Sequence, residues 1–287
     1  MSPRRNARAL EIPRRPTTGK RRALGQHFLR DGDVARRIVD LVRPGARDLV
    51  VEIGPGAGSL TEHLIAAGRL LALEVDPALA ARLRERFLGA AHVEVRDADA
   101  RSFDYAGLAA LRPDPAGRVL VVGNLPYSVG KPILAALIEA GPPLARAGPM
   151  EMALMLQKEV AERVAAPPGG REYGALSVLS QIAFEVSLVF TVPPGAFRPP
   201  PQVESAVLHL RALAEPPVPV ADPARFRAVL RAAFAQRRKN LVNALAPGLG
   251  LPAARVRDAL VSVGIEPERR AETLGLADFA RLADALR

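Results

Sequence analysis

The segment DLVVEIGPGAG, residues 48–58, decides the fold class of this chain. Its first half is a short, almost wholly apolar run, of the kind that forms a strand buried on both faces of a parallel sheet. Its second half is a glycine turn, which lets the backbone reverse tightly and bring its N–H groups close to a ligand. A buried strand that ends in such a turn and leads into a helix is typical of a doubly wound α/β sheet.

Strand-like and helix-like stretches alternate on both sides of this segment. Short apolar runs predict strands, and stretches rich in Ala, Leu and Arg predict helices. The first five strands should be parallel, and the last two, separated by a proline-rich loop, should form an antiparallel edge. We therefore expect an α/β, Rossmann-like domain with a mostly parallel seven-stranded sheet. The expected strands are 48–53, 69–75, 92–96, 118–122, 150–156, 184–192 and 203–210, and the expected helices are 59–67, 77–87 and 131–140.

Composition restricts the class of protein. The chain has 287 residues, is 49% hydrophobic and contains no Cys, so it can bury a large core and has neither disulfides nor thiolate metal sites. No apolar run approaches the roughly 20 residues of a membrane helix, and the N-terminus lacks the apolar core of a secretion signal. We expect a cytoplasmic monomer that holds no metal and has no membrane association.

The net charge of +10 is concentrated at the two ends of the chain. Residues 1–30 contain nine Lys and Arg against one acid, residues 222–287 contain 12 against seven, and the part between them contains 19 against 22. Basic ends favour binding to a polyanion, of which nucleic acid is the commonest in a cytoplasm. A solvated tail, combined with the Arg bias of a GC-rich coding sequence, is the alternative interpretation.

A proline-rich break at 214–223 divides the chain. Helical patterns follow it at 224–246, 252–263 and 277–287, with no strand pattern among them. We predict three parts: a basic, disordered tail at 1–20, a catalytic domain at 21–214, and a small all-helical, RNA-binding domain at 222–287.

Ligands of a doubly wound sheet bind at the carboxyl ends of its strands, and polar residues gather there. Glu74 ends the second strand 20 residues after Gly54, where a carboxylate can accept both hydroxyls of an adenosine ribose. NAD and S-adenosylmethionine both present that ribose. The sixth residue counted from Gly54 is Ser59 rather than the Gly of a dinucleotide fingerprint, and Glu52 is typical of S-adenosylmethionine sites. Asp99, after the third strand, could accept from an adenine amino group; a turn without any ligand is the alternative.

The segment GNLPY at the end of the fourth strand suggests the reaction. An adenine amino nitrogen is a poor nucleophile because its lone pair is delocalised into the ring. The side-chain oxygen of Asn124 and the carbonyl of Leu125 can accept its two hydrogens and localise that pair. Pro126 orients the carbonyl, and the ring of Tyr127 can stack on an extruded base. An Asx turn with an aromatic cap is the alternative, but the position after three suitable strand ends favours an amino-directed methyltransferase.

Six segments, in this order, resemble the ribosomal RNA adenine dimethyltransferase family. The resemblance runs from about Arg21 to the C-terminus, and within the family it is greatest to the members that act on small-subunit (16S) rRNA. It implies an S-adenosyl-L-methionine-dependent enzyme that places two methyl groups on N6 of each of two adjacent adenosines, in a hairpin loop near the 3′ end of that RNA, late in subunit assembly. The segments are LGQHFL (24–29), VEIGPGAG (51–58), LEVD (73–76), GNLPY (123–127), FRPPPQVESA (197–206) and FAQRRKNLVNAL (234–245).

The resemblance also assigns residues to roles. The catalytic segment is Asn124, Leu125, Pro126 and Tyr127, without departure from the family pattern. Many relatives have Asn at the position of His27, and a His packed beneath the N-terminal helix is the alternative to a cofactor contact. The implied cofactor contacts are His27, Leu29, Gly54, Glu74, Asp99 and Asn124.

Two segments are candidates for RNA contact. Phe197 could cover the second face of the target adenine opposite Tyr127, or it could pack into the core. Arg237, Arg238 and Lys239 lie in a stretch predicted to be helical, where they could bind phosphates or form a merely solvated face.

Three classes of function remain open. The first is an rRNA adenine methyltransferase, acting on the small subunit or, as macrolide-resistance enzymes do, on the large one. The second is an assembly or transcription factor that acts mainly by binding nucleic acid. The third is a nicotinamide oxidoreductase, which the missing final glycine and the lack of a proton donor disfavour.

Overall fold

A computed structural model of the chain describes residues 27–287, so the predicted tail at 1–20 lies outside the described residues. Its centre is a seven-stranded sheet with the order β4-β3-β2-β5-β6-β9-β7. The first five strands in that order are parallel, and β9 pairs antiparallel with both β6 and β7. The predicted α/β sheet with an antiparallel edge is confirmed. The strands are β2 Leu49–Ile53, β3 Arg69–Glu74, β4 Val93–Asp97, β5 Val119–Asn124, β6 Met150–Gln157, β7 Phe184–Val192 and β9 Ser205–Ala212.

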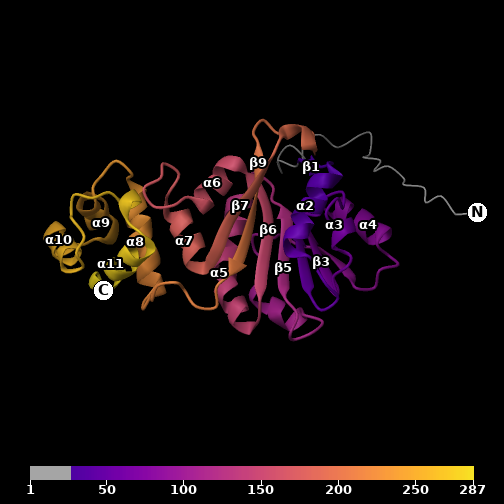
Figure 1. Cartoon of the computed structure of the whole chain (residues 1–287), viewed down its shortest axis with the longest axis horizontal. Helices are drawn as coiled ribbons and strands as arrows, with labels where there is room; N and C mark the ends of the chain where they lie inside the picture. The colour runs from indigo at the N-terminus through magenta and orange to yellow at the C-terminus, as the bar shows by residue number, and fades with distance from the viewer. Residues whose placement is uncertain (1–26) are drawn as a thin grey trace, which may run out of the picture.

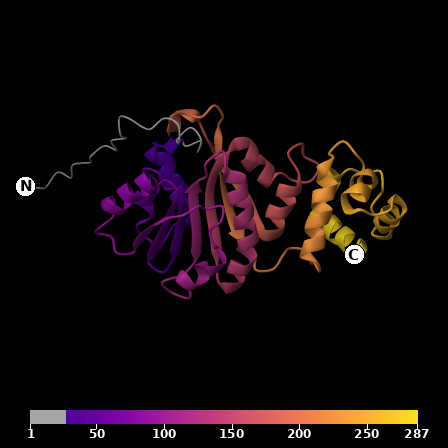
Figure 2. The same ribbon diagram turned by 180° about the vertical axis from the view of Figure 1, so that it is seen from behind.

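Helices cover both faces of this sheet (Figure 1, Figure 2). All five residues of β2 are buried. Leu49, Val51 and Ile53 share a core with α5, while Val50 points the other way, into a core shared with α2. Burial on both faces explains why β2 is a continuous apolar run rather than an alternating one. The helices here are α2 Gly32–Val42, α3 Thr61–Leu64, α4 Pro77–Arg86, α5 Gly130–Ala147, α6 Lys158–Ala165 and α7 Ala175–Ala183, with 3₁₀ turns η1 Ala106–Leu111 and η2 Pro194–Ala196.

The C-terminal helices gather at one end of the molecule, beside α7 (Figure 1). Their core includes Phe226 and Phe279, and it continues into the sheet domain through Tyr173 and Val178. The Tyr173 hydroxyl donates to the Leu274 carbonyl oxygen at 3.0 Å. The predicted division between domains remains an interpretation, because the two parts share this core. The helices are α8 Pro223–Ala235, α9 Leu241–Leu249, α10 Ala253–Ser262 and α11 Leu276–Ala285, with the 3₁₀ turn η3 Ala271–Thr273.

Three predicted helices differ from the observed ones. The helix expected at 131–140 is longer, because α5 continues through Pro142 and Pro143 to Ala147. The helix expected at 59–67 is only one turn, α3, because the glycine turn extends almost to its start. The helix expected at 224–246 is interrupted after Ala235. Asn240 begins a second helix there, since its side chain accepts from the Asn243 N–H at 3.0 Å and caps α9.

Two features of the fold depend on contacts between distant segments. The short strands β1, Phe28–Leu29, and β8, Phe197–Arg198, pair antiparallel and hold the N-terminal segment against the proline-rich loop.

No helix in the described part of the chain is long and apolar enough to cross a membrane.

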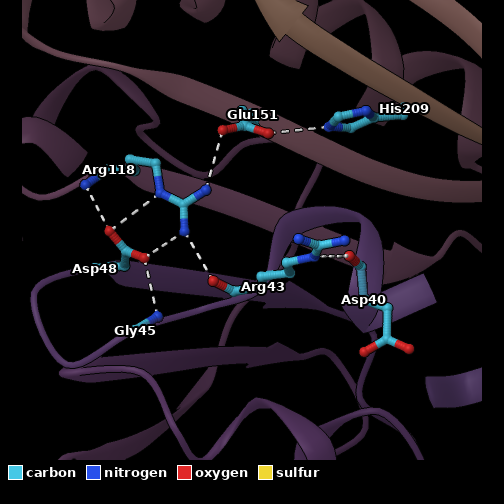
Figure 3. A network of polar contacts seen from close by, with 7 residues as sticks. All are labelled: Asp40, Arg43, Gly45, Asp48, Arg118, Glu151 and His209. Atoms are coloured by element: carbon cyan, nitrogen blue, oxygen red, sulfur yellow. Dashed lines mark hydrogen bonds and ion pairs between the residues drawn. The ribbon is translucent and has the colours of Figure 1, made fainter. Parts of the chain in front are cut away.

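The second feature is a charged network at the amino ends of the central strands (Figure 3). Arg118 forms ion pairs with Asp48 at 2.7 Å and Glu151 at 3.1 Å, and Glu151 also contacts His209 at 3.0 Å. Burial alone would raise the pKa of Asp48, but hydrogen bonds from Arg118 and Gly45 outweigh it and lower that pKa. The network therefore ties β2, β5, β6 and β9 together at the edge of the sheet opposite the carboxyl ends.

Candidate active site

A cavity opens at the carboxyl ends of β2, β3 and β5, where a doubly wound sheet binds its ligands. Counted with its open mouth, it has an empty volume of about 950 Å³, enough for a ligand of nucleoside size. The structure brings all the predicted cofactor contacts and the whole predicted catalytic segment to this one cavity. The lining includes His27, Leu29, Gly54, Glu74, Asp99, Asn124, Leu125, Pro126 and Tyr127.

The glycine turn forms one wall of the cavity. Gly54 and Gly56 have φ angles of 63° and 57°, in the left-handed region that favours glycine. A side chain at Gly56 would also collide with Phe28 of β1, because a Cβ there would lie 2.9 Å from two ring carbons. The sequence pattern thus has two causes in the structure, a backbone that requires glycine and a close approach by the N-terminal segment.

Glu74 is held beside this turn. Its Oε2 accepts from the Gly56 N–H at 3.0 Å and its Oε1 from the Asp76 N–H at 2.9 Å. The side chain is buried, and burial raises its pKa although those two N–H groups act in the opposite direction. Each carboxylate oxygen retains a lone pair for a further donor, such as a ribose hydroxyl.

Glu52 is the most unusual group of the cavity. It lies on β2, is 1% exposed, and accepts through Oε2 from the Thr61 hydroxyl at 2.7 Å. Its Oε1 is buried with no hydrogen-bond partner among the described residues. Burial, with a smaller contribution from Glu74, raises the pKa of Glu52 to about 8. A buried and unpartnered oxygen on the cavity wall is the polar atom that a bound ligand would satisfy.

Asp99 and Leu29 contribute in different ways. Asp99 accepts hydrogen bonds from the guanidinium and the backbone N–H of Arg101, which lower its pKa. Leu29 is buried on β1, and its carbonyl oxygen accepts from the Ser59 hydroxyl at 2.6 Å. The roles predicted for both residues toward a cofactor remain predictions.

His27 connects three parts of the site. Its carbonyl oxygen accepts from Asn124 Nδ2 at 2.9 Å, and its ring Nδ1 lies 2.8 Å from the Pro199 carbonyl oxygen. The ring lies against that of Tyr127, with 5.3 Å between centroids. His27 therefore lies at the edge of the cavity.

Asn124 ends β5 with its side chain at the cavity. Because Nδ2 donates to the His27 carbonyl, the amide orientation is set and Oδ1 is the atom left to accept. Leu125 is anchored next to it, since its N–H donates to the Met155 carbonyl oxygen at 3.0 Å. Tyr127 is half-buried, and its hydroxyl lies 2.6 Å from the Ser205 hydroxyl.

Two predictions for RNA contact need correction. Phe197 is only 4% exposed and packs in the core on β8, so it is not available to stack on a base; the second of the two alternatives holds. Arg237, Arg238 and Lys239 are exposed but lie in the turn between α8 and α9, not on a helix, because α8 ends at Ala235. None of these three lines the cavity.

Sequence reasoning did not identify two residues that support the site, Thr61 and Ser205. Thr61 carries no signal in the pattern, because its partner Glu52 is on another element. Ser205 lies inside the segment FRPPPQVESA, so a signal was present, but its partner Tyr127 is 78 positions away.

A comparison of the whole sequence with protein families matches residues 17–287 to the family described as ribosomal RNA adenine dimethylase. The chain belongs to the ribosomal RNA adenine dimethylase family. The match includes every described residue of the cavity.

Individual members of the family give a more detailed comparison. The chain is 44% identical to the ribosomal RNA small subunit methyltransferase A of Geobacter sulfurreducens, over 93% of this chain and 95% of that one. It is 41% identical to the protein of the same name from Moorella thermoacetica, over 97% and 96%. Among solved structures it is similar to the 23S rRNA methyltransferase ErmE, with a TM-score of 0.66, 28% identity, and coverage of 90% of this chain and 99% of that one.

A more distant solved structure shows the fold alone. The dimethyladenosine transferase from Plasmodium falciparum has a TM-score of 0.72 at 23% identity, with coverage of 89% of this chain and 96% of that one. The comparison supports the methyltransferase fold.

Proposed function

We propose that this chain is an S-adenosylmethionine-dependent methyltransferase that dimethylates N6 of two adjacent adenosines near the 3′ end of small-subunit (16S) rRNA. The observation that carries the proposal is the fixed amide of Asn124. Its Nδ2 donates to the His27 carbonyl oxygen, which leaves Oδ1 as the acceptor atom of this amide at the cavity. Such an acceptor activates an amino group, because a hydrogen bond from the N–H to the acceptor localises the lone pair on the nitrogen.

The residues of the cavity fit S-adenosylmethionine. Glu74 would accept the ribose hydroxyls, the backbone of the Gly54 turn would face the ligand, and Asp99 would accept from the adenine amino group. Glu52 Oε1, which has no partner among the described residues, would be a further polar contact. Because burial raises the pKa of this carboxyl to about 8 and its Oε2 accepts from Thr61, Oε1 would donate to the ligand at neutral pH. When bound, this cofactor supplies an electrophilic methyl group, so the protein needs no strong general base.

The target adenine would enter beside Tyr127. The Asn124 Oδ1 and the Leu125 carbonyl would accept the two hydrogens of its amino group, and the Tyr127 ring would stack on its face. After methyl transfer the nitrogen releases one proton to solvent. Phosphates farther along the RNA would meet the exposed residues Arg237, Arg238 and Lys239.

The test is Asn124→Ala, assayed with purified small subunits that lack the modification. We expect transfer of labelled methyl groups to fall at least a hundredfold, while calorimetric affinity for S-adenosylmethionine changes by less than about tenfold. Ser180→Ala is the control, because that hydroxyl is buried and has no partner among the described residues. Full activity of Asn124→Ala would exclude the proposed role of this amide.

The relatives support the choice of the small subunit. The two named for the small subunit are 44% and 41% identical to this chain, whereas the 23S rRNA methyltransferase is 28% identical. Incubating separate small and large subunits with labelled cofactor, followed by mass spectrometry of the RNA, distinguishes the two. Methylation confined to the large subunit would contradict the proposal. Light scattering of the purified chain tests the expected monomer.

A further inference from the structure

The hydroxyl of Tyr127 forms a hydrogen bond with a residue that does not line the cavity. Ser205 is fully buried, and its hydroxyl lies 2.6 Å from the Tyr127 hydroxyl. Either oxygen can donate, and burial raises the pKa of Tyr127, so the phenol stays protonated and the hydrogen bond stays intact across the neutral range. This is a fixed contact between the site and the sheet.

Ser205 is itself immobile. It is the first residue of β9, which lies between β6 and β7, and its register partners are Gln157 on one side and Val192 on the other. The preceding residue, Glu204, accepts through its carbonyl from the Lys158 N–H at 3.0 Å. A hydroxyl with backbone support on both sides is a rigid anchor for a ring carried on a loop.

The same proline-rich segment also holds the second ring of the site. The Pro199 carbonyl lies 2.8 Å from the His27 Nδ1, and the His27 ring in turn lies against Tyr127. Because Phe197 is buried, this segment contributes to the site by fixing two rings rather than by offering its own.

We propose that Ser205 is a positioning residue that fixes the Tyr127 ring in the orientation needed to receive the target base. The inference rests on the proposed function, because it concerns the base that Tyr127 would stack. A free tyrosine on a loop would have to be ordered each time a base entered, and the hydrogen bond to Ser205 removes that cost beforehand. Ser205 thus acts on catalysis without touching either substrate.

The test compares Ser205→Ala, Tyr127→Phe and the double variant. Both single changes delete the same hydrogen bond and keep the Tyr127 ring or its phenyl equivalent. We expect each to lower kcat for small-subunit methylation about three- to tenfold, the effect of one hydrogen bond of ordinary net strength, and the double variant to be no slower than either. KM for the subunit should change less than twofold, because phosphate contacts dominate its affinity.

The controls separate positioning from folding. Affinity for S-adenosylmethionine should match that of Ser180→Ala, which removes an equally buried hydroxyl that makes no hydrogen bond within residues 27–287. The melting temperature should lie no more than about 4 °C below that of Ser180→Ala, the cost of one hydrogen bond. If Ser205→Ala does not fold, kcat of Tyr127→Phe alone is the test, because this change removes the same hydrogen bond at the half-buried Tyr127.

Three outcomes are distinct. No methylation by the unaltered chain would contradict the proposed function itself. If the unaltered chain is active and both single variants keep full kcat, Ser205 does not position Tyr127. If the losses of the two single variants multiply in the double variant, the two hydroxyls act independently, and the proposed role of Ser205 is again wrong.

Discussion

Glu52 makes the stability of this protein depend on pH in an unusual direction. Its carboxyl is 1% exposed and one of its oxygens has no partner in the described part of the chain, so the folded state favours the neutral form. The pKa rises from 4.5 in the unfolded chain to about 8 in the folded one. Between those values the unfolded chain releases its proton and the folded chain does not. Stability is therefore fully present below pH 4.5 and is lost as pH rises through 8.

The size of the effect follows from the shift. One pKa unit corresponds to about 1.36 kcal/mol, so the raised pKa of Glu52 lowers the free energy of unfolding by about 1 kcal/mol at pH 5 and by about 5 kcal/mol at pH 9. Glu52→Gln has nearly the same shape, its amide oxygen can accept from Thr61, and it does not ionise. The free energy of unfolding of the variant, relative to the unaltered chain, should rise by about 4 kcal/mol between these two pH values.

Urea unfolding at 25 °C and at pH 5, 7 and 9, without cofactor, measures the effect. Glu139→Gln is the matched control, because it changes an exposed glutamate on α5, and its unfolding curve should shift equally at each pH. If Glu52→Gln and the unaltered chain differ by the same free energy at pH 5 and pH 9, Glu52 is ionised in the folded protein and the reasoning from burial is wrong.

Three further predictions concern cofactor, RNA and the sheet. Glu74→Gln should weaken S-adenosylmethionine binding about ten- to a hundredfold by calorimetry while leaving kcat at saturating cofactor less affected, because the ribose contact precedes the chemistry. Replacing residues 237–239 by Ala should lower affinity for small-subunit RNA and reduce the slope of log K against log salt by about 2, as measured by filter binding; an unchanged slope would exclude phosphate contacts there. Arg118→Met should cost about 3 kcal/mol of unfolding free energy, because it leaves Asp48 buried without its cation, whereas Arg211→Met, which breaks an exposed pair, should cost less than about 1 kcal/mol in the same urea titration.

Local patterns in the sequence were sufficient for much of the fold. The strands β2, β3 and β5 could be predicted to within two residues at each end, because burial on both faces demands continuous apolar runs and glycine or polar residues end them. The positions of Gly54, Glu74 and Asn124 at strand ends placed them at one edge of the sheet, since parallel strands end together there. The sequence by itself therefore determined the class of fold and the location of the site.

The tertiary structure alone decided how the site is supported. The pairing of β1 with β8, the contact of Asn124 with the His27 backbone and the anchoring of Tyr127 by Ser205 join residues 78 or more positions apart. No local periodicity encodes such contacts, because they depend on where the whole chain places its segments. The same reason applies to Phe197, whose sequence allowed either a stacking surface or a core residue, and whose burial followed from the β1–β8 pair.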